Sequence, residues 1–143
     1  MPTHPSGAAS FASGGIYFHG VRADPTDIAG VRRSMQQWLG NLDLGPEHEQ
    51  DVVLASYEAL ANAVEHAYAA DDPSATVDLE AVYRPRDRHL EVTVADHGRW
   101  RDAVEQTGYG SRGHGLTLMR SLSTEMVVTP SVDGTHVAMR WSL

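Results

Sequence analysis

Apolar and polar residues follow two different periods along this chain, and these periods predict its helices and strands. Apolar side chains recur at helical spacing in three segments, at about 26–39, 47–69 and 113–123. They alternate with polar side chains, as in half-buried strands, in five shorter segments, at 16–22, 76–83, 89–95, 126–129 and 135–141. This order predicts an α+β fold, a two-layer α/β sandwich whose mixed, mostly antiparallel sheet carries its helices on one face.

Capping and turn residues indicate where these segments begin and end. Asp24 or Thr26 can cap the first helix, and Pro73 ends the region of the second. The sequences at 84–87 and at Asp133-Gly134 are typical of hairpin turns. Residues 96–111 follow neither period, and a loop of this length inside a compact domain is usually functional or disordered.

The first fifteen residues are small, polar and rich in proline, glycine and serine. This composition predicts a flexible segment at 1–15, followed by a single domain at 16–143. The segment has neither the basic start nor the apolar stretch of a signal peptide, and the sequence has no apolar run long enough to span a membrane. We therefore expect a soluble, cytoplasmic protein.

The composition excludes several kinds of chemistry. All eleven basic residues are arginines, so a Walker A loop, the strand lysine of eukaryotic-type kinases and Schiff-base catalysis are excluded. The chain has no cysteine, which excludes disulfides, thiol nucleophiles and cysteine zinc sites, and its eight histidines show no strong zinc spacing. The formal net charge of −8 argues against direct binding to nucleic acid.

Three segments carry candidate chemistry, and the first lies on the second predicted helix. Glu58, Asn62 and His66 follow one another at steps of four residues and stand on one stripe of that helix. In one interpretation this stripe simply faces solvent. In the other it lines a ligand pocket among small alanines, where the Glu58 carboxylate meets a metal, a donor or a substrate proton.

The second candidate is Asp96, which ends a predicted strand and is followed by His97 and Gly98. A carboxylate at this place can accept a hydrogen bond from an amino group such as that of adenine, and the glycine lets backbone approach a ligand closely. A strand-terminating turn or a helix cap would have a similar sequence.

The third candidate is a glycine cluster, with four glycines among residues 108–115, directly before the last predicted helix. Free N–H groups at the start of that helix would bind phosphate oxygens, and Arg112 would add positive charge. A flexible surface loop is the alternative interpretation.

Together and in this order, the three segments resemble one family. The matching motifs are E-x-x-x-N-A-x-x-H-A at 58–67, VADHG at 94–98, GSRGHGLTLM at 110–119 and Gly134-Thr135 before the last strand. They resemble the Bergerat-fold ATPases, the GHKL group that includes histidine kinases and gyrase. Within that group the chain is most similar to the RsbW-like anti-sigma factor serine/threonine kinases of bacteria, and the resemblance covers nearly everything from Ile16 to Leu143.

The resemblance implies a role for each matching residue. Asn62 matches the asparagine that coordinates Mg²⁺, and Glu58 matches the carboxylate proposed as general base. Asp96 matches the acceptor of the adenine amino group with Gly98 beside it, and Thr135 matches the threonine that supports this aspartate. The other nucleotide-binding residues implied, from the first motif and from the glycine box with its helix start, are His66, Arg112, Gly113, His114, Gly115 and Leu116.

The implied function is that of an anti-sigma factor with ATP- and Mg²⁺-dependent protein serine/threonine kinase activity. Such a protein would sequester a sigma factor and phosphorylate an anti-anti-sigma antagonist of the STAS type, and it would form a homodimer through its first strand and helix. Trp100 departs from the family pattern, because it stands where the D-x-G-x-G box has its second glycine. This departure favours the alternative, a non-catalytic sigma-regulator binding module with a structural or degenerate nucleotide pocket.

Overall fold

The computed structural model describes residues 8–12, 14–67, 74–98 and 115–143, and at 8–12, 66 and 67 it describes the backbone alone. Six strands and three helices lie within these ranges. Their bounds, in chain order, are β1 (Ala8–Ala12), β2 (Gly15–Arg22), α1 (Pro25–Gly40), α2 (Pro46–Ala67), β3 (Thr76–Arg84), β4 (His89–Asp96), α3 (Gly115–Leu122), β5 (Glu125–Ser131) and β6 (Gly134–Ser142).

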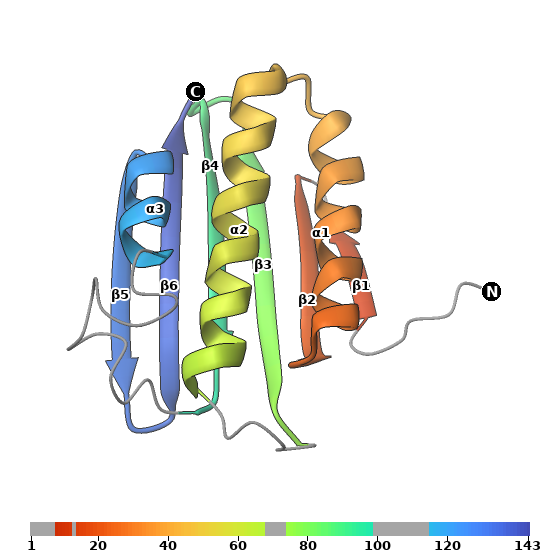
Figure 1. The fold of residues 1–143 in the computed structure, drawn as a ribbon. Helices are drawn as coiled ribbons and strands as arrows, with labels where there is room; N and C mark the ends of the chain where they lie inside the picture. The colour runs from red at the N-terminus through yellow and green to blue at the C-terminus, as the bar shows by residue number, and fades with distance from the viewer. Residues whose placement is uncertain (1–7, 13, 68–73, 99–114) are drawn as a thin grey trace.

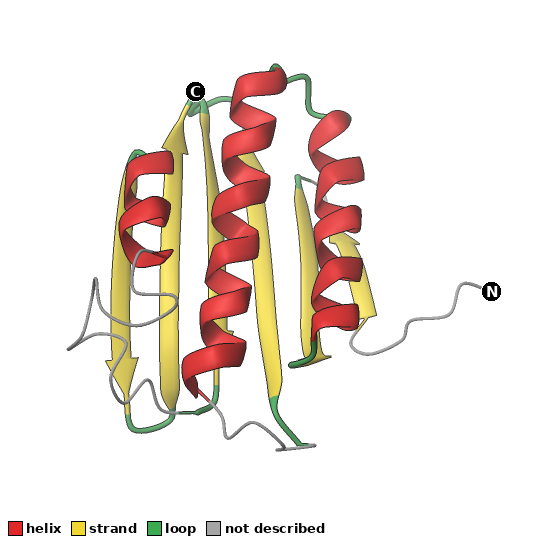
Figure 2. Ribbon diagram, in the orientation of Figure 1, coloured by secondary structure: helices red, strands yellow, loops and turns green. Residues whose placement is uncertain are grey.

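The strands form one sheet in the order β1-β2-β3-β4-β6-β5. The helices all lie against the same face of this sheet (Figure 1 and Figure 2). The predicted two-layer α+β sandwich with helices on one face is therefore confirmed. Every neighbouring pair of the described strands is antiparallel, so the expected mixture of strand directions is not found among them.

The strand β1 lies within the segment 1–15 that the composition predicts to be flexible. Residues Ala8–Ala12 pair with β2 in an antiparallel register that runs from Ala8 opposite His19 to Ala12 opposite Gly15. The segment has no alternating pattern that would reveal a strand, because its pairing depends on backbone groups. The N–H and C=O groups along the outer edge of β2 need partners, and a neighbouring backbone of almost any composition can supply them.

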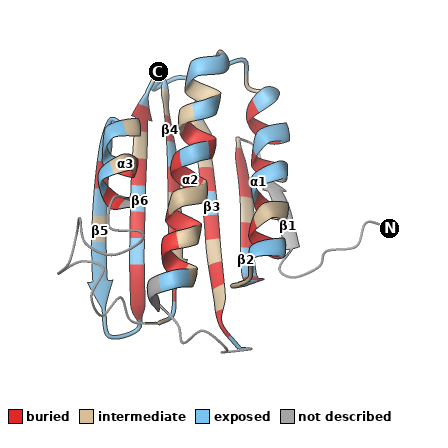
Figure 3. Ribbon diagram, viewed as in Figure 1, coloured by how far each residue is buried: buried red, intermediate tan, exposed pale blue. Residues whose placement is uncertain are grey.

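Alternation along the central strands separates an apolar face of the sheet from a polar one. Leu79 of β3, Val94 of β4 and Val137 of β6 lie side by side in register and are buried beneath the helices. Their neighbours Glu80 and Ala138 point to the opposite face and are exposed. Figure 3 shows this alternation as red and paler bands along β3 and β6. One face of the sheet thus forms the core with the helices.

The sequence offers two candidates, Asp24 and Thr26, for the residue that caps the start of α1. Asp24 has extended backbone geometry, its Oδ1 accepts a hydrogen bond from the Asp27 amide at 3.0 Å, and Pro25 follows directly. This hydrogen bond lowers the pKa of the Asp24 carboxyl below its usual value. Asp24, and not Thr26, is therefore the cap of α1.

The helix α2 lies between α1 and α3 over the middle of the sheet (Figure 1). It contacts the sheet and both other helices, so it is buried over much of its circumference, as a helix that is apolar nearly all round should be. Its fully buried residues include Val52, Ala55, Ala59, Leu60 and Ala63. Within the described ranges, no helix combines the length and the apolar character that crossing a membrane requires.

Candidate functional site

The described ends of three elements that carry candidate residues lie at one end of the sandwich, although these elements come from distant parts of the sequence. The C-terminal end of α2, the end of β4 and the start of β6 all lie at the lower end of the view in Figure 1. The helix α3 lies beside α2, and its first residue is at its lower end in the same view. The antiparallel pairing of β4 with β6 brings Asp96 next to Thr135, which is 39 residues away in the sequence.

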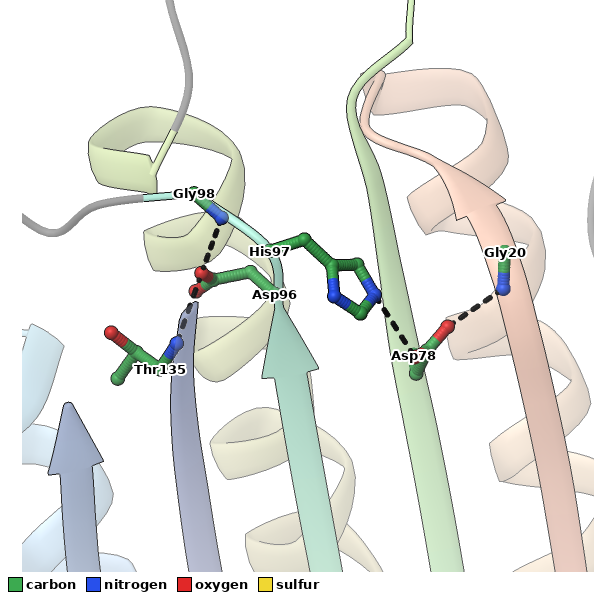
Figure 4. Close-up of polar contacts among 6 residues, drawn as sticks. All are labelled: Gly20, Asp78, Asp96, His97, Gly98 and Thr135. Atoms are coloured by element: carbon green, nitrogen blue, oxygen red, sulfur yellow. Dashed lines mark hydrogen bonds and ion pairs between the residues drawn. The ribbon is translucent and has the colours of Figure 1, made fainter. Parts of the chain in front are cut away.

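Asp96 is a buried carboxylate that two backbone amides hold in place. Its Oδ1 accepts hydrogen bonds from the amide of Gly98 at 3.1 Å and from the amide of Thr135 at 3.2 Å (Figure 4). The side chain is only 2% exposed. Because both donors are backbone groups, the carboxylate keeps one orientation, as an acceptor that recognises a donor group on a ligand requires.

Gly134 allows β6 to begin close to the end of β4. Its φ is +138°, and a Cβ added to it would lie 1.9 Å from the carbonyl oxygen of Asp96. A side chain at this position would therefore collide with the backbone that carries the carboxylate. The sequence showed Gly134 as part of a turn and of a motif, but its steric role was missed, because it depends on a strand distant in the sequence.

Asn62 and Glu58 lie one turn apart on α2. Asn62 is 1% exposed, and its Nδ2 donates a hydrogen bond to the backbone oxygen of Glu58 at 3.1 Å. With Nδ2 bound in this way, the amide oxygen is the atom that can act as a metal ligand. Glu58 is half-buried, and its Oε2 is enclosed. The interpretation in which this stripe simply faces solvent is wrong for Asn62.

The other predicted site residues are placed only in part. Gly115 begins α3, and Leu116, the next residue of this helix, is buried in the core. His66 lies on α2, but its side chain is outside the described residues. Also outside the described residues are Trp100, Arg112, Gly113 and His114. The glycine cluster is therefore described only from Gly115 onward.

The described residues do not by themselves form a metal site. Within the described ranges there is no group of three or more His, Asp or Glu side chains that could hold a metal ion. A cation beside Asn62 would therefore need further oxygen ligands from a bound molecule or from water. Mg²⁺ fits this donor set, because it is bound through oxygen, keeps several waters and is commonly shared with phosphate groups.

Comparison with known proteins identifies the family. Residues 21–141 match the histidine kinase-like ATPase domain, and this match covers most of the chain. The protein therefore belongs to the family of histidine kinase-like ATPase domains. Members of this class are built around a site for ATP, and the resemblance to the GHKL group inferred from the motifs is confirmed.

Several solved structures share the fold. The chain aligns with the RsbU and RsbW domains of Rv1364c from Mycobacterium tuberculosis at 23% identity and a TM-score of 0.72, over 90% of this chain and 32% of that one. It aligns with the histidine kinase domain of a blue-light activated histidine kinase from Erythrobacter litoralis at 22% identity and a TM-score of 0.56, over 82% and 60%. It aligns with a chain of the SiaB–SiaC complex from Pseudomonas aeruginosa at 14% identity and a TM-score of 0.60, over 89% and 88%. This protein thus spans only about a third of the Rv1364c chain.

Proposed function

We propose that this protein is a protein serine/threonine kinase that uses ATP with Mg²⁺ and acts as an anti-sigma factor. The observation that carries the proposal is the buried Asp96 carboxylate, held by the Gly98 and Thr135 amides. It lies at the same end of the sandwich as the end of α2, which carries the buried Asn62 (Figure 1). In a histidine kinase-like ATPase domain, this arrangement supports an adenine site close to a phosphate site.

Asp96 would recognise the base of the nucleotide. A carboxylate only accepts hydrogen bonds, so it would favour a purine that presents an amino group, such as adenine, over one that presents a carbonyl oxygen at the same edge. The amides of Gly98 and Thr135 already hold the carboxylate, so little conformational entropy is lost when the base binds.

Asn62 would hold Mg²⁺ through its amide oxygen, together with phosphate oxygens and water. The bound ion would offset the negative charge of the β- and γ-phosphates. Backbone N–H groups of Gly115 and Leu116 at the start of α3 would bind phosphate oxygens. We propose that Arg112, Gly113 and His114 extend this phosphate site and that His66 borders it from α2. In a chain without lysine, glycine amides, a helix start and arginine would take the role of the phosphate-binding lysine.

Glu58 would act on the phosphate acceptor. Its carboxylate would orient the serine or threonine hydroxyl of the partner and accept its proton. The hydroxyl oxygen forms a bond to the γ-phosphorus as the bond between that phosphorus and the β,γ-bridging oxygen breaks, and ADP leaves. Glu58 and Asn62 are one helical turn apart, so the general base and the metal ligand would act from the same side of α2.

The partners in this proposal are a sigma factor and an anti-anti-sigma protein of the STAS type, and the protein would act in the cytoplasm. RsbU and RsbW domains occur together in Rv1364c, and SiaB occurs in a complex with SiaC, so folds of this kind occur in protein assemblies. The net charge of −8 supports protein partners and not nucleic acid. A homodimer that pairs through β2 does not fit the strand order, because β1 and β3 occupy both edges of β2. A dimer formed by pairing of strands would therefore use β1.

Label transfer from γ-labelled ATP tests the proposal. The protein is incubated with Mg²⁺ and candidate STAS proteins, and we expect label on a serine or threonine of one of them. Glu58→Gln should abolish transfer and keep ATP binding, whereas Asp96→Asn should weaken ATP binding itself. Glu47→Gln, an exposed carboxylate in the first turn of α2, is the matched control and should leave both unchanged.

Trp100 favours a second candidate function, because it replaces the second glycine of the D-x-G-x-G box. In this candidate the protein regulates by binding alone, and the nucleotide pocket is structural or degenerate. Specific binding of a sigma factor or STAS protein without label transfer, and with the same affinity in the presence and absence of ATP, would establish the second candidate and exclude the kinase.

A further inference from the structure

The carboxylate of Asp78 on β3 joins two parts of the sheet that are distant in sequence. Its Oδ1 accepts a hydrogen bond from the amide of Gly20 at 2.7 Å, and its Oδ2 lies 3.3 Å from Nε2 of His97 (Figure 4). Gly20 lies where the pairing register of β2 with β3 shifts, between Phe18 and Val21, and it has a φ of +69°. Asp78 therefore holds the irregular part of β2 on one side and the residue after β4 on the other.

His97 is the middle residue of the turn that carries the Asp96 carboxylate. The Gly98 amide donates to Asp96 Oδ1, which closes a local turn over residues 96–98. The backbone of His97 links the acceptor residue Asp96 to the donor residue Gly98, so a shift of the His97 backbone changes the geometry of this turn. A contact that fixes the His97 side chain therefore restricts the geometry of the whole turn.

The same turn is confined from its other side by β6. Gly134 has no Cβ, and a Cβ built at this position would lie only 2.9 Å from the Cα of His97. The Thr135 amide binds the Asp96 carboxylate from this side. Figure 4 shows Thr135 and Asp78 on opposite sides of the turn. The turn is thus held between β6 and β3.

We propose that Asp78 and His97 are positioning residues that hold the Asp96 carboxylate in the orientation that selects adenine. This inference rests on the proposed function, in which Asp96 binds the base. His97 is 58% exposed and Asp78 is 27% exposed, and contacts between such side chains contribute little to global stability. The effect of breaking the contact should therefore appear in the choice of nucleotide and not in the unfolding of the domain.

The test compares the affinity for ATP with that for a purine riboside triphosphate that lacks the exocyclic amino group, by calorimetric titration in the presence of Mg²⁺. Wild type should prefer ATP. Asp78→Ala and His97→Ala should each reduce this preference about two- to fivefold, the upper part of the range that a contact between partly exposed side chains contributes. The double variant should lose no more than the stronger single variant, because both substitutions remove the same contact.

Two further variants separate positioning from a structural role. His97→Gln keeps a donor that can reach Asp78, so it should restore most of the preference for ATP. Glu80→Ala is the matched control, because Glu80 is an exposed carboxylate on the same strand and the same face, two residues from Asp78. It should leave the preference unchanged, and thermal unfolding should verify that each variant is folded.

The possible failures can be told apart. If wild type prefers ATP and Asp96→Asn loses that preference, but Asp78→Ala and His97→Ala keep it, the positioning role is wrong and the adenine site stands. If wild type shows no preference between the two nucleotides, the adenine-binding role of Asp96 is wrong, and the positioning role is wrong with it.

Discussion

Replacing Gly134 with alanine tests whether the close approach of β6 to β4 builds the Asp96 site. A Cβ on residue 134 would lie 1.9 Å from the Asp96 carbonyl oxygen, whereas real Cβ atoms are essentially never closer than 3.0 Å to such a neighbour. The oxygen belongs to the backbone, so no side-chain rotation can relieve the contact. The two strand ends must therefore separate by about 1 Å, the difference between these two distances.

Two costs follow from this separation. A non-glycine residue in so rare a backbone conformation costs about 1–3 kcal/mol. The separation also stretches the 3.2 Å hydrogen bond from the Thr135 amide to Asp96 Oδ1 beyond hydrogen-bond range, and a bond to a charged group contributes about 1.5–3 kcal/mol. We expect the free energy of unfolding to fall by about 3 kcal/mol or more. The affinity for ATP should fall about tenfold, which corresponds to the loss of about 1.4 kcal/mol of binding free energy.

Urea unfolding measures the stability of the variant, and calorimetric titration with ATP and Mg²⁺ measures its affinity. Gly45→Ala is the matched control, because Gly45 also has a positive φ, of +94°, but a Cβ there meets nothing within 4 Å. It carries the backbone strain without the collision and lies at the other end of α2. If Gly134→Ala were no more destabilising than Gly45→Ala and bound ATP as wild type does, the steric account of the site would be wrong.

The other predictions concern the metal ligand, the helix cap and the core. Asn62→Ala should bind ATP in the presence of Mg²⁺ at least about tenfold more weakly than wild type, because it removes the amide oxygen, and equal Mg²⁺ dependence in the two proteins would contradict the metal assignment. Asp24→Ala should cost about 1 kcal/mol at pH 7 in urea unfolding. The pKa of the Asp24 carboxyl is lowered in the folded state, so the stability that this cap contributes is complete above the usual carboxyl pKa of 3.8 and is lost as the pH falls through the lowered folded-state pKa. Urea unfolding at a series of pH values measures this loss. Leu60→Ala should cost about 2–5 kcal/mol in the same assay, and Leu54→Ala much less, because the two leucines of α2 are 1% and 39% exposed.

The local patterns of the sequence predicted most of the elements because the periods that define them are local. Alternation along 76–83 and 89–95 gave two strands that the structure extends by one residue each, to Arg84 and Asp96. The apolar character of 47–69 predicted a buried helix, and the structure describes α2 over Pro46–Ala67. Strand β1 escaped prediction because its place depends on the free edge of β2 and not on a pattern of its own side chains.

The candidate site was predictable as a set of residues but not as a geometry. The motifs placed Glu58, Asn62, Asp96 and Thr135 on their elements, and the order of the motifs indicated the family. The helical period shows which residues share a face of the helix with Asn62. It does not show whether that face is turned toward solvent or toward the interior of the protein. Burial of Asn62 was decided by the sheet and by the neighbouring helices.

What the sequence determined by itself is the succession of elements from β2 onward, the absence of lysine and cysteine, and the chemical types available for a nucleotide site. What only the tertiary structure decided is which of these groups meet. The Thr135 amide reaches Asp96 across 39 residues, and Asp78 reaches His97 and Gly20 across neighbouring strands. Such contacts depend on strand order and register, which arise from backbone pairing between distant segments, and no local pattern of side chains encodes them.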